Sequence, residues 1–82
     1  MNILFFASLR EKLDTDKEHW TELHDIKTTK ELLDKLKDRG EPWLSALSIP
    51  QLIISVNQEV SDLNTDIALG DEVAFFPPVT GG

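Results

Sequence analysis

The fold is decided by the C-terminal stretch Glu72-Val73-Ala74-Phe75-Phe76-Pro77-Pro78-Val79-Thr80-Gly81-Gly82. Its first five residues are mostly apolar and predict a strand at 72–76. The two prolines that follow fix φ and favour extended polyproline II geometry. We therefore expect a single domain overall, with a folded part at 1–76 and an extended Gly-Gly tail at 77–82.

The tip of this tail indicates where its chemistry lies. Gly82 ends the sequence with a carboxylate, and Gly81 beside it has no side chain, so the tip is thin enough to enter a narrow active site. We expect Gly82 to react and Gly81 to give it steric access. Successive side chains of a strand point to opposite faces, and we expect this alternation to turn the Phe76 side chain into the sheet core. The expected contacts with a partner are Phe75, Pro77, Pro78, Val79 and Thr80.

Composition excludes several classes of partner. The 82 residues carry a formal net charge of -7, which argues against nucleic acid and against an anionic membrane surface. There are no cysteines, so no thiol can serve as a nucleophile, a redox group or a metal ligand. The apolar runs are the size of strands, and the start lacks the features of a signal peptide, so we expect a cytoplasmic protein without a membrane span.

Further strands are expected at 2–8, 17–23, 52–57 and 60–61, where apolar or alternating residues lie between turn residues. A short helical turn places Leu9 and Leu13 on one side. Trp20, in the second strand, is expected to pack on the sheet, with His19 pointing outward.

The main helix begins at Thr28 or Thr29, because Thr28 and Glu31 have the spacing of a capping box, and Gly40 is suited to its end. A second short helix is predicted at 41–47. The apolar side chains expected to face the core from these two helices are Leu32, Leu33, Leu36, Trp43, Leu44 and Leu47.

This order of elements predicts an α+β fold with one main helix packed on one face of a mixed sheet. The first and last strands are the most apolar pair, and we expect them to be parallel neighbours at the centre. That arrangement is typical of the β-grasp, or ubiquitin-like, layout.

No conventional active site is visible in the rest of the chain. His19 and His24 have no matching acid cluster, which makes a metal site improbable. The serines lack the context of a nucleophile elbow, and no glycine-rich phosphate loop is present. We therefore expect no bound metal or cofactor, and chemistry that partner proteins perform at the terminus.

Four blocks of sequence resemble a known family. They are the ending at 75–82, Leu4-Phe5-Phe6-Ala7 followed by Leu9-Arg10-Glu11, Val56-Asn57-Gln58, and the run at 69–76. Together they resemble the small, sulfur-carrying subunits of molybdopterin synthases, a ubiquitin-related family.

The resemblance implies a β-grasp sulfur carrier that is not an enzyme on its own. An ATP-using enzyme similar to ubiquitin-activating enzymes would adenylate the carboxylate of Gly82, and sulfur would then replace one oxygen to give a thiocarboxylate. The tail would next enter the large synthase subunit and donate sulfur to cyclic pyranopterin monophosphate. Two such transfers would build the dithiolene of molybdopterin.

Three alternatives stay open at this stage. The chain could carry sulfur for thiamin or for tRNA thiolation, which reconstitution with the pterin substrate would separate. It could be a ubiquitin-like modifier, which would accumulate in lysine-linked adducts of higher mass. It could also be an interaction domain with an inert tail, for which replacement of Gly82 would leave the function intact.

Overall fold

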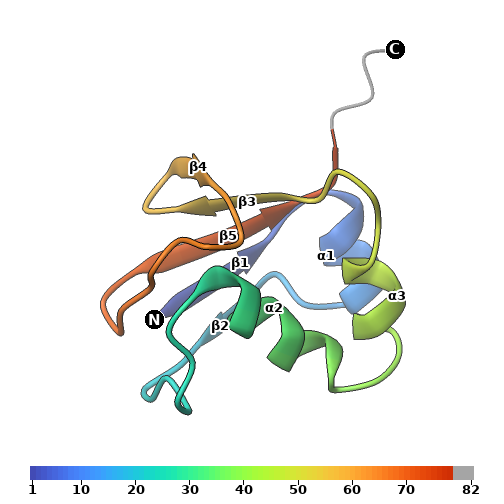
Figure 1. Cartoon of the computed structure of the whole chain (residues 1–82). Coiled ribbons are helices and arrows are strands. Elements are labelled where there is room, and N and C mark those ends of the chain that lie inside the picture. Colours follow the sequence, from blue (N-terminus) through green and yellow to red (C-terminus); the bar gives the residue numbers. More distant parts are fainter. Residues whose placement is uncertain (79–82) are drawn as a thin grey trace.

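The computed structural model describes residues 1–78 and forms one five-stranded sheet with three helices (Figure 1). The strands run in the order β2-β1-β5-β3-β4 across the sheet. The elements follow the chain as β1 (Asn2–Phe5), α1 (Ser8–Leu13), β2 (Lys17–His19), α2 (Thr29–Lys37), α3 (Trp43–Leu47), β3 (Ile53–Val56), β4 (Glu59–Ser61) and β5 (Glu72–Phe76).

The centre of the sheet is the parallel pair of β1 and β5. Their register aligns Asn2 with Glu72 and Phe5 with Phe75, and the other strand pairs are antiparallel. β5 lies between β1 and β3, so the last strand of the chain has a neighbour on each side. The α+β, β-grasp layout expected from the sequence is confirmed.

The core fills the space between the sheet and the helices. Alternate residues of the two central strands, including Ile3, Phe5 and Phe75, are almost completely buried. Leu32 and Leu36 of α2 are 0% exposed, and Leu9, Leu33, Leu13 and Leu47 join the same cluster. The predicted apolar faces of the helices are therefore confirmed, with one exception at Leu44.

The start of α2 has the predicted capping box. The Thr28 Oγ1 accepts a hydrogen bond of 3.3 Å from the backbone N–H of Glu31, and the Glu31 carboxylate accepts one of 3.1 Å from the N–H of Lys27. The first bond satisfies an N–H group of the first helical turn, and the second joins the Glu31 side chain to the backbone just before the cap. Gly40, with φ of +88°, follows the end of the helix.

Three sequence predictions were wrong in detail. The first strand ends at Phe5 instead of Ser8, because Ala7 has φ of +53° and turns the chain into α1, where Leu9 becomes buried. The second strand ends at His19 instead of Leu23. Leu44 is 47% exposed, because the five-residue helix α3 turns Ala46 and Leu47 inward instead.

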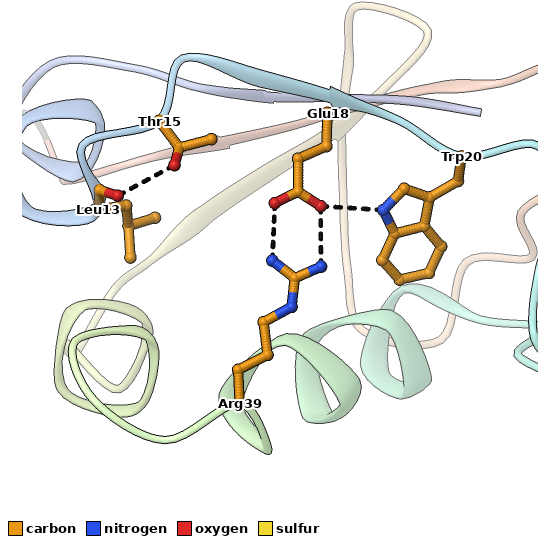
Figure 2. Close-up of polar contacts among 5 residues, drawn as sticks. All are labelled: Leu13, Thr15, Glu18, Trp20 and Arg39. Carbon is orange, nitrogen blue, oxygen red and sulfur yellow. Dashed lines mark hydrogen bonds and ion pairs between the residues drawn. The ribbon is translucent and has the colours of Figure 1, made fainter.

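A charged bridge joins the edge strand β2 to the end of α2, as Figure 2 shows. The Arg39 guanidinium donates two hydrogen bonds to the Glu18 carboxylate, at 2.6 and 2.8 Å, and the indole N–H of Trp20 donates a third at 3.0 Å. Arg39 also lies 4.4 Å from the centre of the Trp43 ring. The hydrogen bond from Arg39 lowers the pKa of Glu18, against the opposing effect of burial.

A second polar cluster fixes the start of β5. The Asn57 side chain donates to Asp71 Oδ1 and accepts from the backbone N–H of Glu72, each at 3.0 Å, and the Asn57 N–H donates to the Glu72 carbonyl at 2.8 Å. Asn57 has φ of +52°, a conformation that asparagine tolerates better than most residues. Asn57 is far from Asp71 and Glu72 in the sequence, and these hydrogen bonds bring the three residues together at the start of β5.

None of the helices described between residues 1 and 78 has the length and apolar character needed to cross a membrane.

We predict that Asn57→Ala lowers the free energy of unfolding by about 2 kcal/mol, because it removes the side-chain hydrogen bonds and forces alanine into a left-handed conformation. Asn57→Gly removes the same bonds without that strain and should cost about half as much, roughly 1 kcal/mol. Urea unfolding of the two variants measures the difference. Equal losses would show that the backbone conformation contributes nothing.

We also predict a pH dependence from the Glu18–Arg39 pair. Because the folded chain lowers the pKa of Glu18, the pair stabilises the fold above the ordinary value of 4.5, and this stabilisation is lost as the pH falls below it. Glu18→Gln should destabilise the protein by about 0.5–1 kcal/mol at neutral pH, since both partners are partly exposed. The difference from wild type should shrink in acid.

Glu22→Gln is the matched control for this experiment, because Glu22 is exposed and forms no ion pair among residues 1–78. A constant difference between wild type and Glu18→Gln across the acid range would contradict the assignment.

Candidate functional site

The candidate site is the end of β5, from which the chain continues into the tail. β5 ends at Phe76, and Pro77 and Pro78 follow as half-buried residues at the rim of the domain. In Figure 1 the C-terminal end of β5 lies at the same end of the sheet as α1 and α3. The predictions for Val79, Thr80, Gly81 and Gly82 lie outside the described residues.

The two phenylalanines at the end of β5 face opposite to the predicted directions. Phe75 is 0% exposed and stacks on Phe5 with ring centres 5.8 Å apart, so the prediction that it contacts a partner was wrong. Phe76 is half-buried on the other face. The sequence predicted that the two side chains point to opposite faces, but not which face each one takes, because β5 is central and carries apolar residues on both faces.

An apolar patch lies on the sheet face opposite the core and reaches Phe76, the residue before Pro77 at the root of the tail. We call it the open-face patch and define it by Leu4, Phe6, Val60, Ala74 and Phe76, which line a shallow hollow of about 410 Å³. Phe6 is 38% exposed and Val60 is 81% exposed. The remaining lining residues are polar: Ser55, Gln58 and Glu72. An exposed apolar patch rimmed by polar residues is typical of a protein-binding surface.

Sequence reasoning missed two members of this patch. Phe6 was assigned to the first strand without a role, although period two from Leu4 places both on one face. Val60 was assigned to a short returning strand, and its position as the apolar residue between Glu59 and Ser61 was the available signal.

Within the patch, Phe6 and Phe76 are closely paired. Their ring centres are 4.6 Å apart and their planes differ by 4°. The Phe6 backbone N–H also donates to the Phe75 carbonyl at 3.2 Å, which extends the pairing of β1 and β5 by one residue. The last residue of the central strand is thus held by both backbone and side-chain contacts.

A larger groove, of about 550 Å³, lies between α2, α3, β3 and the chain that follows β4. Leu33, Leu47 and Leu63 are among its lining residues, none of which belongs to β5 or to Pro77-Pro78. We place the functional site at the tail root instead of this groove, because among the described residues β5 and Pro77-Pro78 lead to the Gly-Gly ending, and none of them lines the groove.

The two histidines have structural contacts. The His19 Nδ1 lies 2.7 Å from the side-chain oxygen of Asn2, and the His24 ring packs edge-on against Trp20. Among residues 1–78, no three acidic or histidine side chains gather in a group that could hold a metal ion.

Comparison with known proteins connects this geometry to a family. The family model described as the ThiS family matches residues 3–82. Two curated relatives, both named molybdopterin synthase sulfur carrier subunit, come from Haemophilus influenzae and Escherichia coli. They are 38% and 40% identical to this chain, and each match covers 100% of this chain and 99% of the relative.

Solved structures have the same fold. The small archaeal modifier protein 1 of Haloferax volcanii is 26% identical, with a TM-score of 0.69, over 96% of this chain and 97% of that one. A chain in the complex of subunits 1 and 2 of the molybdopterin-converting factor from Helicobacter pylori is 24% identical, with a TM-score of 0.67. That match covers 99% of this chain and 96% of the other. At these sequence identities, the similarity to the two solved structures is evidence for the fold of this chain.

Proposed function

Because the chain belongs to the ThiS family, we propose that it is the sulfur-carrying small subunit of a molybdopterin synthase. The observation that carries the proposal is the tail root: a central strand that ends in Phe76-Pro77-Pro78, beside an exposed apolar patch. The names of the curated relatives support the same function.

The chemistry proposed for Gly82 follows from the properties of a carboxylate. A terminal carboxyl group has a pKa of about 3.5, so it is ionised at neutral pH and resists nucleophilic attack. Attack of the carboxylate on the α-phosphate of ATP would release pyrophosphate and leave an acyl adenylate. A sulfur nucleophile would then displace AMP, and the product would be a thiocarboxylate at Gly82.

In the second half of the cycle, this sulfur is transferred to the pterin. In the large subunit, the thiocarboxylate sulfur would attack a carbon of cyclic pyranopterin monophosphate, and the C–O bond at that carbon would break so that its oxygen leaves. Water would then cleave the acyl–sulfur bond, so that the sulfur stays on the pterin and Gly82 regains a carboxylate. A second loaded carrier would deliver the second sulfur of the dithiolene.

In this proposal the carrier itself is not an enzyme, and partner proteins supply both active sites. The part of the chain that the structure describes contributes position: a folded anchor and a tail with a defined origin. Gly81 would admit the tip to a narrow channel, and Pro77 and Pro78 would keep the tail extended. ATP would be used by the activating enzyme, without a cofactor bound to the carrier.

The open-face patch is the surface that we propose for docking. Val60 and Phe6 expose apolar area within reach of the tail root, and a partner that covers them would receive the tail at the same time. Apolar area of this kind carries most of the free energy of binding at protein interfaces, particularly where aromatic side chains are included.

The similarity to an archaeal modifier protein supports a second candidate function, that of a ubiquitin-like modifier. A ubiquitin-like modifier would use the same adenylated Gly82, but a lysine amine would attack it in place of sulfur. The two functions share the tail and differ in the acceptor.

We predict that the wild-type chain gains one oxygen-to-sulfur exchange in intact mass when it is incubated with ATP, a sulfur source and the activating enzyme. One alanine added after Gly82 should abolish sulfur transfer to the pterin, because the reacting carboxylate moves. The extended chain should unfold at the same temperature, since the change adds nothing to the residues that form the core. Mass spectrometry of the last peptide measures the loading.

The outcomes of this experiment separate the alternatives. A chain that loads sulfur but never converts cyclic pyranopterin monophosphate would serve another thiolation pathway. Adducts to lysines would indicate a modifier. An extended chain that remains active would contradict the role of Gly82.

We predict that Val60→Asp raises the concentration of large subunit needed for half-maximal sulfur transfer by about tenfold or more, because it places a charge in an apolar interface. Its thermal stability should be unchanged, since Val60 is 81% exposed. Leu69→Asp is the control: Leu69 is also exposed, but it precedes β5 at the opposite end from the tail. Equal effects of the two changes would contradict docking at the open-face patch.

A further inference from the structure

The stacked pair of Phe6 and Phe76 lies outside the core. Phe6 is 38% exposed and Phe76 is half-buried, whereas their neighbours Phe5 and Phe75 supply the buried stack on the other face. A stack at a partly exposed position buries less apolar area than one in the core, so it contributes less to the stability of the fold. The fold therefore does not depend on this pair as it does on the buried one.

The backbone next to Phe6 is in an unfavourable conformation. Ala7 has φ of +53° and ψ of -129°, a region that residues with a Cβ rarely adopt. The turn at Ala7 leaves the Phe6 carbonyl to accept a hydrogen bond of 3.1 Å from Leu9, while the Phe6 N–H remains bonded to Phe75. This turn lets Leu9 enter the core and leaves the Phe6 ring on the open face against Phe76.

The position of Phe76 decides where the tail points. Phe76 precedes a proline, which restricts its own backbone to extended conformations. Pro77 and Pro78 then have fixed φ angles, so few rotations remain between Phe76 and the residues that follow. On one side Phe76 is paired with Ile53 of β3, and on the other its ring is held by Phe6.

We propose that Phe6 is a positioning residue: by stacking on Phe76 it sets the direction in which the tail leaves the sheet. This inference rests on the proposed function, since the direction matters only if Gly82 must reach a partner's active site. A misplacement of about 1 Å at a reacting group can cost on the order of a hundredfold in rate.

A set of variants separates positioning from docking. Phe6→Leu keeps apolar area for a partner but removes the planar stack, and Phe6→Tyr keeps the ring. Leu44→Ala is the control for loss of an exposed apolar side chain, because Leu44 is 47% exposed on α3, outside the open-face patch. All carriers would be prepared with a C-terminal thiocarboxylate by intein chemistry, so that activation does not limit the reaction.

We expect Phe6→Leu to lower the single-turnover rate of sulfur transfer at saturating large subunit by about tenfold or more, with less than a threefold change in the half-saturating concentration. Phe6→Tyr should restore the rate, and Leu44→Ala should match wild type. If Phe6→Leu changes only the half-saturating concentration, Phe6 is a docking contact and the inference is overturned.

A second measurement needs no partner. Three-bond couplings between the backbone and the Phe76 ring carbon report its χ1 rotamer in the free protein by NMR. We expect one rotamer in wild type and Phe6→Tyr, and averaged couplings in Phe6→Leu. Unchanged couplings in Phe6→Leu would overturn the inference even if the rate falls. A wild-type carrier that transfers no sulfur would defeat the proposed function alone, because the couplings still decide whether Phe6 holds Phe76.

Discussion

The parallel pairing of β1 with β5 is the contact on which the rest of the structure depends. It joins the two ends of the chain, with Asn2 opposite Glu72 and Phe5 opposite Phe75. Parallel neighbours need a long connection, and here nearly the whole chain supplies it, including all three helices. As a result the last strand is central, and the chain continues toward its Gly-Gly ending from one of the most buried segments of the domain.

The central position of β5 also explains why its two faces differ in use. Val73 and Phe75 face the helices and are 0% exposed, so they contribute to stability. Ala74 and Phe76 face the open side, where the described part of the chain places no helix over them. Both faces are apolar, one because it is buried within the domain and the other, in our proposal, because a partner covers it. In this proposal one strand therefore contributes to folding through one face and to docking through the other.

Much of this fold could be predicted from the sequence because its signals were local. The capping box at Thr28 and Glu31, the leucines of α2 and the run at 72–76 were all assigned correctly, since each depends on spacing within a few residues. The errors have a different origin. The end of β1 at Phe5 depends on a positive φ at Ala7, and the directions of Phe75 and Phe76 depend on where the helices pack. Neither feature can be predicted from the spacing of neighbouring residues, because both depend on how distant parts of the chain pack.

The site was only partly predictable for the same reason. The Gly-Gly tail was visible as a motif, whereas Val60 and Phe6 join it only when β4 and β1 fold to either side of β5. Conversely, Asn57 and Asp71-Glu72 were noticed as family motifs without a physical role, and the structure gives them one. They fix the first residue of β5, while Phe6 holds the last.

A strand fixed at both ends is what a carrier of this kind requires. If the start of β5 were loose, the register between β1 and β5 would be free to slip, and a slip of one residue would exchange the faces of Phe75 and Phe76. The polar cluster at Asn57 opposes that slip through hydrogen bonds that only one register satisfies. The aromatic stack at the other end then acts on a strand whose register is already set. The direction of the chain at Phe76 therefore depends on the ordered start of the same strand, which lies four residues away, or about 13 Å at the rise of an extended chain.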